Sequence, residues 1–135
     1  TLDRSSAASD VYKRQEVKAG FGRTGKMFST EHWDIVPDLM TVAKGITSSY
    51  LPLAATVCTT GVSEVFAGEQ NTFKQALTFG GHPVCAEAAL ANIEIIEQEK
   101  LVENSANAGK YFLKKLNGLK EIHPIIGDCR WLWLL

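Results

Sequence analysis

The stretch Asp38-Leu-Met-Thr-Val-Ala-Lys-Gly-Ile-Thr-Ser-Ser49 joins an apolar, β-prone run to a lysine and a glycine. Leu39–Ala43 is typical of a buried strand of an α/β sheet, and Gly45 begins the turn that leaves it. Lys44 is therefore expected at the carboxyl end of the strand, where open α/β sheets bind their ligands. An amine partly removed from water at such a site can attack a carbonyl carbon. The alternative is a lysine that only extends its ammonium group into solvent.

The composition is that of an ordinary globular domain. The chain has 135 residues, of which 45% are hydrophobic, and its net charge is -1. This balance gives no electrostatic basis for binding nucleic acid or an anionic membrane. No apolar run approaches the roughly 20 residues that a membrane helix needs. The three cysteines, Cys58, Cys85 and Cys129, are odd in number and lack metal-ligand spacing, so we expect reduced thiols, no metal site and a cytoplasmic location.

The remaining pattern alternates short strands and helices. The sequence predicts a connector with a helical turn at residues 27–34, a second strand at residues 54–60 and a short helix at residues 62–66. Two long helices follow, one from Pro83 onward and one at residues 101–116. The apolar face of the first long helix is expected to consist of Ala86, Ala89, Leu90, Ile93 and Ile96. His82, just before this helix, is expected to cap or pack rather than to catalyse.

Three segments carry a family resemblance: Glu16-Val-Lys-Ala-Gly-Phe-Gly-Arg-Thr-Gly-Lys-Met-Phe28, residues 37–52, and Leu77-Thr-Phe-Gly-Gly-His-Pro-Val84. In this order and at these separations they resemble the class III aminotransferases, which use pyridoxal 5'-phosphate (PLP) on a fold-type I scaffold.

The resemblance implies an α/β fold whose parts follow one another along the chain. A portion of the large PLP-binding domain is expected at residues 16–82. The connecting helices follow at residues 83–117, and the small C-terminal domain starts at residues 118–135. Residues 1–15 do not resemble the family.

The same resemblance implies roles for individual residues. Lys44 matches the catalytic lysine that forms a Schiff base with the cofactor and then transfers protons. Val17 matches the apolar residue that packs on the cofactor ring, and Lys18 stands where many members have a glutamine near the phenolic oxygen. Thr78 matches the threonine that binds the cofactor phosphate from the neighbouring subunit, which implies a homodimer. By itself, Thr78 is more typical of a plain loop threonine than of a phosphate ligand.

The sequence departs from the family pattern at three places. Gln15 occupies the position of an aspartate whose charge keeps the pyridinium nitrogen protonated, and a neutral amide cannot do this. Residues 1–14 form a polar stretch with no strand or helix period. Trp131 and Trp133 stand where family members usually have glycines. We therefore expect an internal piece of a longer enzyme with foreign sequence at its ends.

A rival motif overlaps the first family segment. Residues 20–26 fit G-x-x-x-x-G-K, the phosphate-binding loop of nucleotide hydrolases. However, Met27 occupies the Ser/Thr position that binds magnesium, and residues 12–18 are too polar to predict the preceding strand. Pro37 also limits any following helix to about two turns. These features favour a loop near the cofactor over a nucleotide site.

The resulting functional hypothesis is a transaminase that moves an amino group from an ω-amino acid or amine to a pyruvate-like 2-oxo acid. The choice of a small ω-amino donor rests on resemblance at residues 45–53 and at Phe79-Gly-Gly81. The alternative is a truncated relic or binding fragment without catalysis.

Overall fold

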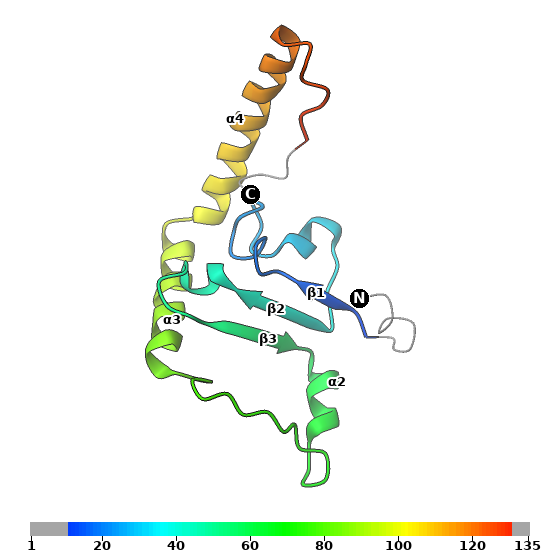
Figure 1. Cartoon of the computed structure of the whole chain (residues 1–135), viewed down its shortest axis with the longest axis vertical. Coiled ribbons are helices and arrows are strands. Elements are labelled where there is room, and N and C mark those ends of the chain that lie inside the picture. Colours follow the sequence, from blue (N-terminus) through cyan, green and yellow to red (C-terminus); the bar gives the residue numbers. More distant parts are fainter. Residues whose placement is uncertain (1–10, 131–135) are drawn as a thin grey trace.

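The computed structural model describes residues 11–130, which contain a three-stranded sheet in the order β1 (Lys13–Gln15), β2 (Leu39–Ala43) and β3 (Ala54–Cys58). β1 runs parallel to β2, and β3 runs antiparallel to β2 (Figure 1). Thr41 of β2 pairs with Gln15 on one side and with Thr56 on the other. The predictions about Trp131 and Trp133 lie outside the described residues.

The helices follow the predicted order. They are the 3-10 helices η1 (Ser29–Trp33), η2 (Lys44–Thr47) and η3 (Glu64–Phe66), and the α-helices α2 (Thr60–Ser63), α3 (Pro83–Gln98) and α4 (Leu101–Ile122). The strand at Leu39–Ala43 and the helix start at Pro83 are confirmed. β3 is shorter than predicted, whereas α4 continues past residue 116 and extends away from the sheet (Figure 1).

The prediction that no strand precedes the glycine-rich segment is wrong, because β1 lies within the polar stretch. Backbone pairing explains β1 better than its side chains do. The amides of Asp38 and Leu39 donate to the carbonyl of Tyr12 at 2.9 and 3.1 Å, and the Tyr12 amide donates to the Asp38 carboxylate at 2.8 Å. Tertiary pairing with β2 therefore overrides a composition that disfavours strands.

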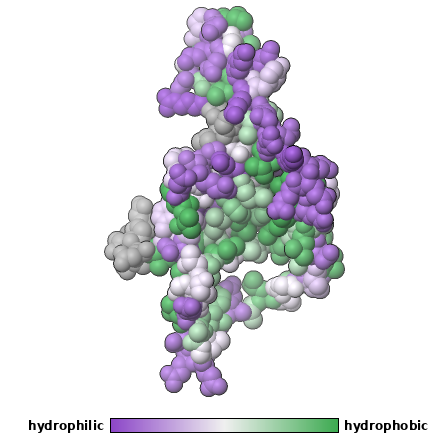
Figure 2. Space-filling view, turned by 180° about the vertical axis from the view of Figure 1, so that it is seen from behind, coloured by the Kyte–Doolittle hydropathy of each residue, from purple (hydrophilic) through white to green (hydrophobic). Residues whose placement is uncertain are grey.

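The apolar core of the described part is small. The buried hydrophobic residues are Val42, Cys85, Ala89 and Ile96. The predicted face of α3 is wrong at Ala86, which is exposed, and at Leu90, which is 62% exposed. The physical reason is that α3 packs against η2 and α4 rather than under a broad layer. Hydrophobic residues therefore gather at the surface over the middle of the molecule (Figure 2).

Several smaller expectations are decided by local contacts. His82 occupies the cap position of α3, but its side chain makes no capping hydrogen bond. Its ring lies 6.4 Å from the Phe79 ring, which agrees with packing. Cys58, Cys85 and Cys129 are free thiols. Within residues 11–130, no helix is both long and apolar enough to cross a membrane.

Candidate active site

The backbone turns sharply at Lys44, where β2 ends. Lys44 has a φ of +49° and Ser48 a φ of +48°, both in the left-handed region. Such a conformation costs a non-glycine residue about 1–2 kcal/mol. The Ser49 amide donates to the Lys44 carbonyl at 2.9 Å and closes residues 44–49, here called the lysine turn. Lys44 lies at the carboxyl end of the strand, as the sequence predicts, but it is exposed rather than partly removed from water.

Gly45 is required by a close approach between this turn and the segment after β1. A Cβ atom at residue 45 would lie 3.1 Å from both Cβ and Cδ2 of Phe21 and 3.4 Å from the Gly20 carbonyl oxygen. A side chain at residue 45 would force Phe21 to move by a few tenths of an ångström, whereas glycine lets the two segments pack this closely without a shift. Gly45 therefore fixes the distance between the lysine turn and residues 20–25, here called the glycine loop.

Three of the predicted cofactor residues lie around one small hollow. Lys44, Val17 and Lys18 line a space of about 310 Å³, together with Arg23, Gly45, Ser48 and Ser49. The side chains contribute three cationic groups and two hydroxyls beside one apolar surface. This set is suited to an anionic ligand with a flat apolar part.

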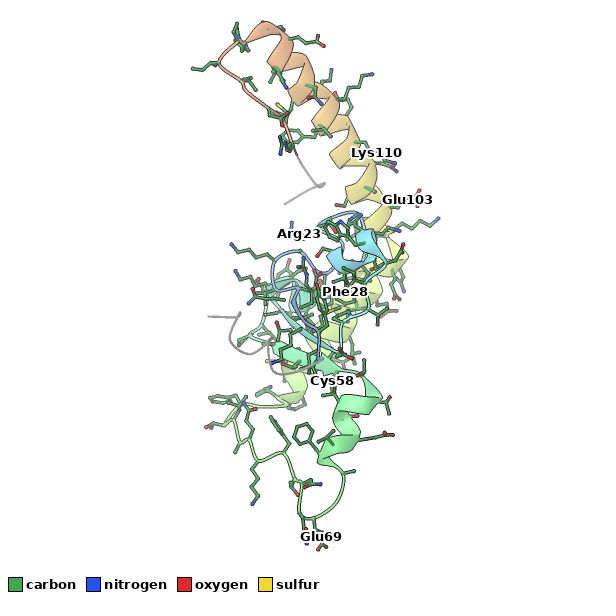
Figure 3. All side chains as sticks on the ribbon, turned by 90° about the vertical axis from the view of Figure 1, so that its right-hand side faces the viewer. Arg23, Phe28, Cys58, Glu69, Glu103 and Lys110 are labelled. Carbon is green, nitrogen blue, oxygen red and sulfur yellow. The ribbon has the colours of Figure 1, made fainter. Side chains whose placement is uncertain are left out.

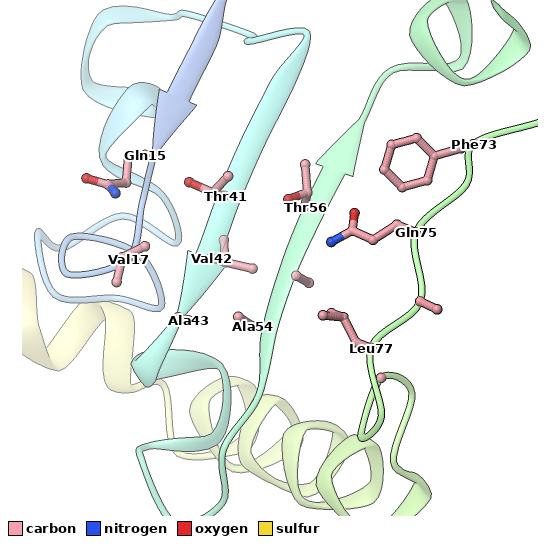
Figure 4. Close-up of a pocket in the computed structure, with 13 residues that line it drawn as sticks. Gln15, Val17, Thr41, Val42, Ala43, Ala54, Thr56, Phe73, Gln75 and Leu77 are labelled. Carbon is pink, nitrogen blue, oxygen red and sulfur yellow. The ribbon is translucent and has the colours of Figure 1, made fainter. Parts of the chain in front are cut away.

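A larger hollow of about 860 Å³ lies over the sheet (Figure 4). Gln15, Thr41 and Thr56 are paired across the three strands and line its floor, while Phe73, Gln75 and Leu77 line the opposite side. Val17 lines both this hollow and the one beside Lys44. The contacts of Gln15 and Val17 with a cofactor ring stay a prediction.

Thr78 is not brought to Lys44. It lies in an exposed turn in which the Gly80 amide donates to the Leu77 carbonyl at 3.0 Å. Leu77 and Gly80 line the larger hollow, but Thr78 is not among its lining residues. The assignment of Thr78 to a phosphate site completed by a neighbouring subunit stays a prediction.

Sequence analysis missed Glu16, which is completely buried. Its carboxylate accepts hydrogen bonds from the Ser29 hydroxyl, from the Ser29 amide at 3.2 Å and from the Thr30 amide at 3.2 Å. Glu16 thereby ties the start of η1 to the end of β1. The sequence did offer one indication that Glu16 is buried. Side chains alternate between the two faces of an extended chain, so Glu16 points away from the face that Gln15 and Val17 share.

The glycine loop does not continue into a long helix. The next element is the short 3-10 helix η1. The loop instead packs against α4, since the Ser105 hydroxyl donates to the Arg23 carbonyl at 3.3 Å and a Cβ at Gly22 would lie 3.3 Å from Val102. Figure 3 shows Arg23 beside the first turns of α4. A phosphate-binding loop needs its amides at the start of a helix, so this arrangement weighs against the nucleotide-binding alternative.

Among residues 11–130, no group of three or more His, Cys, Asp or Glu side chains is placed to hold a metal ion. The described site instead offers an amine, an amide, hydroxyls and apolar surface.

A lysine at the carboxyl end of a sheet strand, beside a hollow, is an arrangement used by enzymes that act on carbonyl groups through an amine. Comparison with known proteins supplies the family. The family described as "Aminotransferase class-III" matches residues 14–134. The chain belongs to the class III aminotransferases.

Individual relatives agree with this family. The chain is 46% identical over 119 residues to a taurine–pyruvate aminotransferase of Bilophila wadsworthia, covering 85% of this chain and 26% of that protein. It is 44% identical over 122 residues to the aminotransferase YhxA of Bacillus subtilis, covering 89% and 27%. The chain thus spans about a quarter of the length of these relatives.

Solved structures show the same fold. A transaminase from the marine bacterium Virgibacillus matches with a TM-score of 0.87 at 41% identity, over 96% of this chain and 30% of that one. A Bacillus anthracis aminotransferase matches with a TM-score of 0.87 at 45% identity, over 92% and 28%. The fold is therefore part of a fold-type I PLP-dependent transferase, and the cofactor of this family is PLP.

Proposed function

We propose that this chain carries the catalytic lysine of a PLP-dependent transaminase and that Lys44 is that lysine. The observation that supports the proposal is the placement of Lys44 at the end of β2, in one hollow with Val17 and Lys18. In a chain of this family, that hollow is the natural place for the cofactor.

The chemical groups of Lys44, Val17 and Lys18 complement most parts of the cofactor. The Lys44 amine would bond to the aldehyde carbon, Val17 would contact the ring, and Lys18 would lie near the phenolic oxygen. When bound, PLP supplies a ring that accepts electrons from the bond being broken. The free Lys44 amine would act as the base that takes the proton from the substrate carbon and as the acid that delivers it to the cofactor carbon.

Gln15 is the one residue whose chemistry does not match. Its amide can form a hydrogen bond with a ring nitrogen but cannot hold a proton there by charge. This observation favours the second candidate function, a fragment that binds the cofactor weakly and does not transaminate. We expect the 135-residue chain itself to show no transaminase activity.

We further propose an amino donor of the ω-amino acid or amine class and pyruvate as the acceptor. The support is that two relatives are named taurine–pyruvate and putrescine–pyruvate aminotransferase. A homodimer in which Thr78 reaches the neighbouring subunit's cofactor belongs to the same proposal.

Reductive trapping tests Lys44 directly. The chain is mixed with PLP, reduced with borohydride and digested, and the modified lysines are counted by mass spectrometry. We expect the adduct mainly on Lys44, and none at that site in Lys44→Arg. Lys114 and Lys115 on α4 are internal controls for surface labelling. A label on Lys44 no stronger than on these two would refute the assignment.

A second variant tests the mismatch at Gln15. Gln15→Asp places a carboxylate on the floor of the larger hollow, and we expect tighter PLP binding by at least about tenfold, which corresponds to 1.4 kcal/mol. Absorbance titration measures the affinity. Thr41→Asp, on the paired strand residue, is the matched control for added charge. Equal effects of the two substitutions would show that position 15 has no special relation to the cofactor.

A further inference from the structure

Asn92 of α3 holds the lysine turn through its side chain. Its amide nitrogen donates to the Gly45 carbonyl at 2.8 Å and to the Ile46 carbonyl at 3.1 Å. Its amide oxygen accepts a hydrogen bond from the Ser48 hydroxyl at 2.6 Å. One half-buried side chain therefore makes three hydrogen bonds to the backbone and side chains that directly follow Lys44.

The turn needs such support. Lys44, Ser48 and Ser49 all have positive φ values, of 49°, 48° and 62°. Left-handed residues other than glycine persist only when their surroundings over-determine them. Backbone hydrogen bonds inside the turn, such as Ser49 amide to Lys44 carbonyl, form in many tight turns and do not select this conformation alone. Asn92 adds bonds from a different element, α3.

The position of Asn92 is itself unusual for a helix. It lies between Ala89 and Ile96 on the side of α3 that packs inward, where an apolar residue would ordinarily be expected. Asparagine is also a weaker helix former than alanine. A polar residue at such a place is expected to have bonds that compensate, and the described structure shows where they go.

We propose that Asn92 is a positioning residue for Lys44. By fixing the carbonyls of Gly45 and Ile46 to α3, it sets the direction in which the Lys44 side chain leaves the strand end. This inference rests on the proposed function of Lys44 for its catalytic meaning, but the positioning itself is a property of the chain without cofactor.

Three variants separate the contributions. Asn92→Ala removes all three side-chain bonds, and Asn92→Asp keeps the acceptor for Ser48 while removing both donors to the carbonyls. Ser48→Ala is the matched control, because it removes only the hydroxyl bond and leaves both carbonyl bonds. Global stability is a poor readout here, since alanine favours the helix and offsets part of the loss.

The first measurement is amide exchange without cofactor. We expect the Ser49 amide to exchange about tenfold faster in Asn92→Ala and Asn92→Asp than in the parent chain, and less than about threefold faster in Ser48→Ala. Amides in the β2–β3 pairing are the internal reference. Ser49 exchange within about twofold of the parent in both Asn92 variants would overturn the inference.

The second measurement is the reactivity of Lys44 relative to Lys114, using reductive methylation with formaldehyde and cyanoborohydride. A residue that positions Lys44 should change the Lys44-to-Lys114 labelling ratio by at least about twofold when it is removed. An unchanged ratio beside faster Ser49 exchange would show that Asn92 stabilises the turn without directing Lys44, which also overturns the inference. Failure of PLP to trap Lys44 in the parent chain would instead count against the proposed function alone, because neither measurement uses the cofactor.

Discussion

Replacing Glu16 tests whether hydrogen bonds to a buried carboxylate hold η1 to β1. Glu16 is completely inaccessible to solvent, and its two carboxylate oxygens accept three hydrogen bonds from Ser29 and Thr30. The guanidinium of Arg14 is only a distant partner, since its Nε atom lies 3.7 Å from the nearer carboxylate oxygen. The negative charge is therefore stabilised mainly by the start of η1.

The expected loss follows from these contacts. In Glu16→Gln, one of the two oxygens becomes an NH2 group, which faces a donor of Ser29 or Thr30 and leaves at least one buried donor unpaired. This costs about 1–3 kcal/mol. Glu16→Ala leaves the amides of Ser29 and Thr30 and the Ser29 hydroxyl without their acceptor, at a cost of about 3 kcal/mol or more. A small protein has only about 5–15 kcal/mol in total, so the alanine variant is expected to lose a large share of its free energy of unfolding.

Urea denaturation measures the free energy of unfolding, and amide exchange at Ser29 and Thr30 locates the change. Glu31→Gln is the matched control, because Glu31 is exposed and accepts one hydrogen bond from the Phe28 amide at 2.7 Å. We expect Glu31→Gln to cost about 1 kcal/mol or less. A Glu16→Gln variant as stable as Glu31→Gln, with unchanged exchange at Ser29, would refute the reasoning.

Two further predictions concern packing and charge. Gly45→Ala forces a Cβ against Phe21 and should lower the free energy of unfolding by about 1–3 kcal/mol in urea denaturation. Gly61→Ala is the control, because Gly61 lies in helix α2 and a Cβ there would have no neighbouring atom within 4 Å; it should raise the free energy of unfolding by up to about 1 kcal/mol. Equal effects of the two substitutions would contradict the close approach at Gly45. Hydrogen bonds from Arg130 and then Lys120 hold the pKa of the Asp128 carboxyl below its ordinary value of 3.8. Because this folded-state pKa is lowered, the stabilisation is present above pH 3.8 and is lost as the pH falls through the lowered value. Carboxyl NMR should place the Asp128 midpoint below 3.8 and move it upward in Lys120→Gln, and a midpoint at or above 3.8 in the parent chain would contradict the prediction.

The sequence predicted the parts of the fold that depend on local pattern. The apolar run of β2 and the proline at the start of α3 each carry a strong local signal, and both elements begin where predicted. β1 carried none, because its three residues are polar and its existence depends on pairing with β2. The exposure of Leu90 could not be predicted either, because periodicity shows which side of a helix is apolar but not what covers that side.

The site shows the same division. Lys44, Val17 and Lys18 could be placed together only through the family resemblance, because the strand that leads to Val17 and Lys18 was not predicted. Asn92 could not be linked to Lys44 from the sequence, because the contact joins a helix to a turn far away along the chain. An isolated asparagine in an apolar helix indicates only that some partner exists.

Polar contacts, more than apolar packing, determine the geometry of the described site. The buried apolar side chains of residues 11–130 are few, whereas Glu16, Thr24, Ser29, Thr30, Thr47 and Ser105 are buried polar residues. Apolar contacts are non-directional and tolerate small shifts, but a hydrogen bond weakens steeply when its angle changes. Glu16 fixes the segment after β1 and Asn92 fixes the turn after β2, so each of the two segments that line the Lys44 hollow has at least one directional anchor. Disturbing either anchor should therefore alter the hollow well before it unfolds the chain.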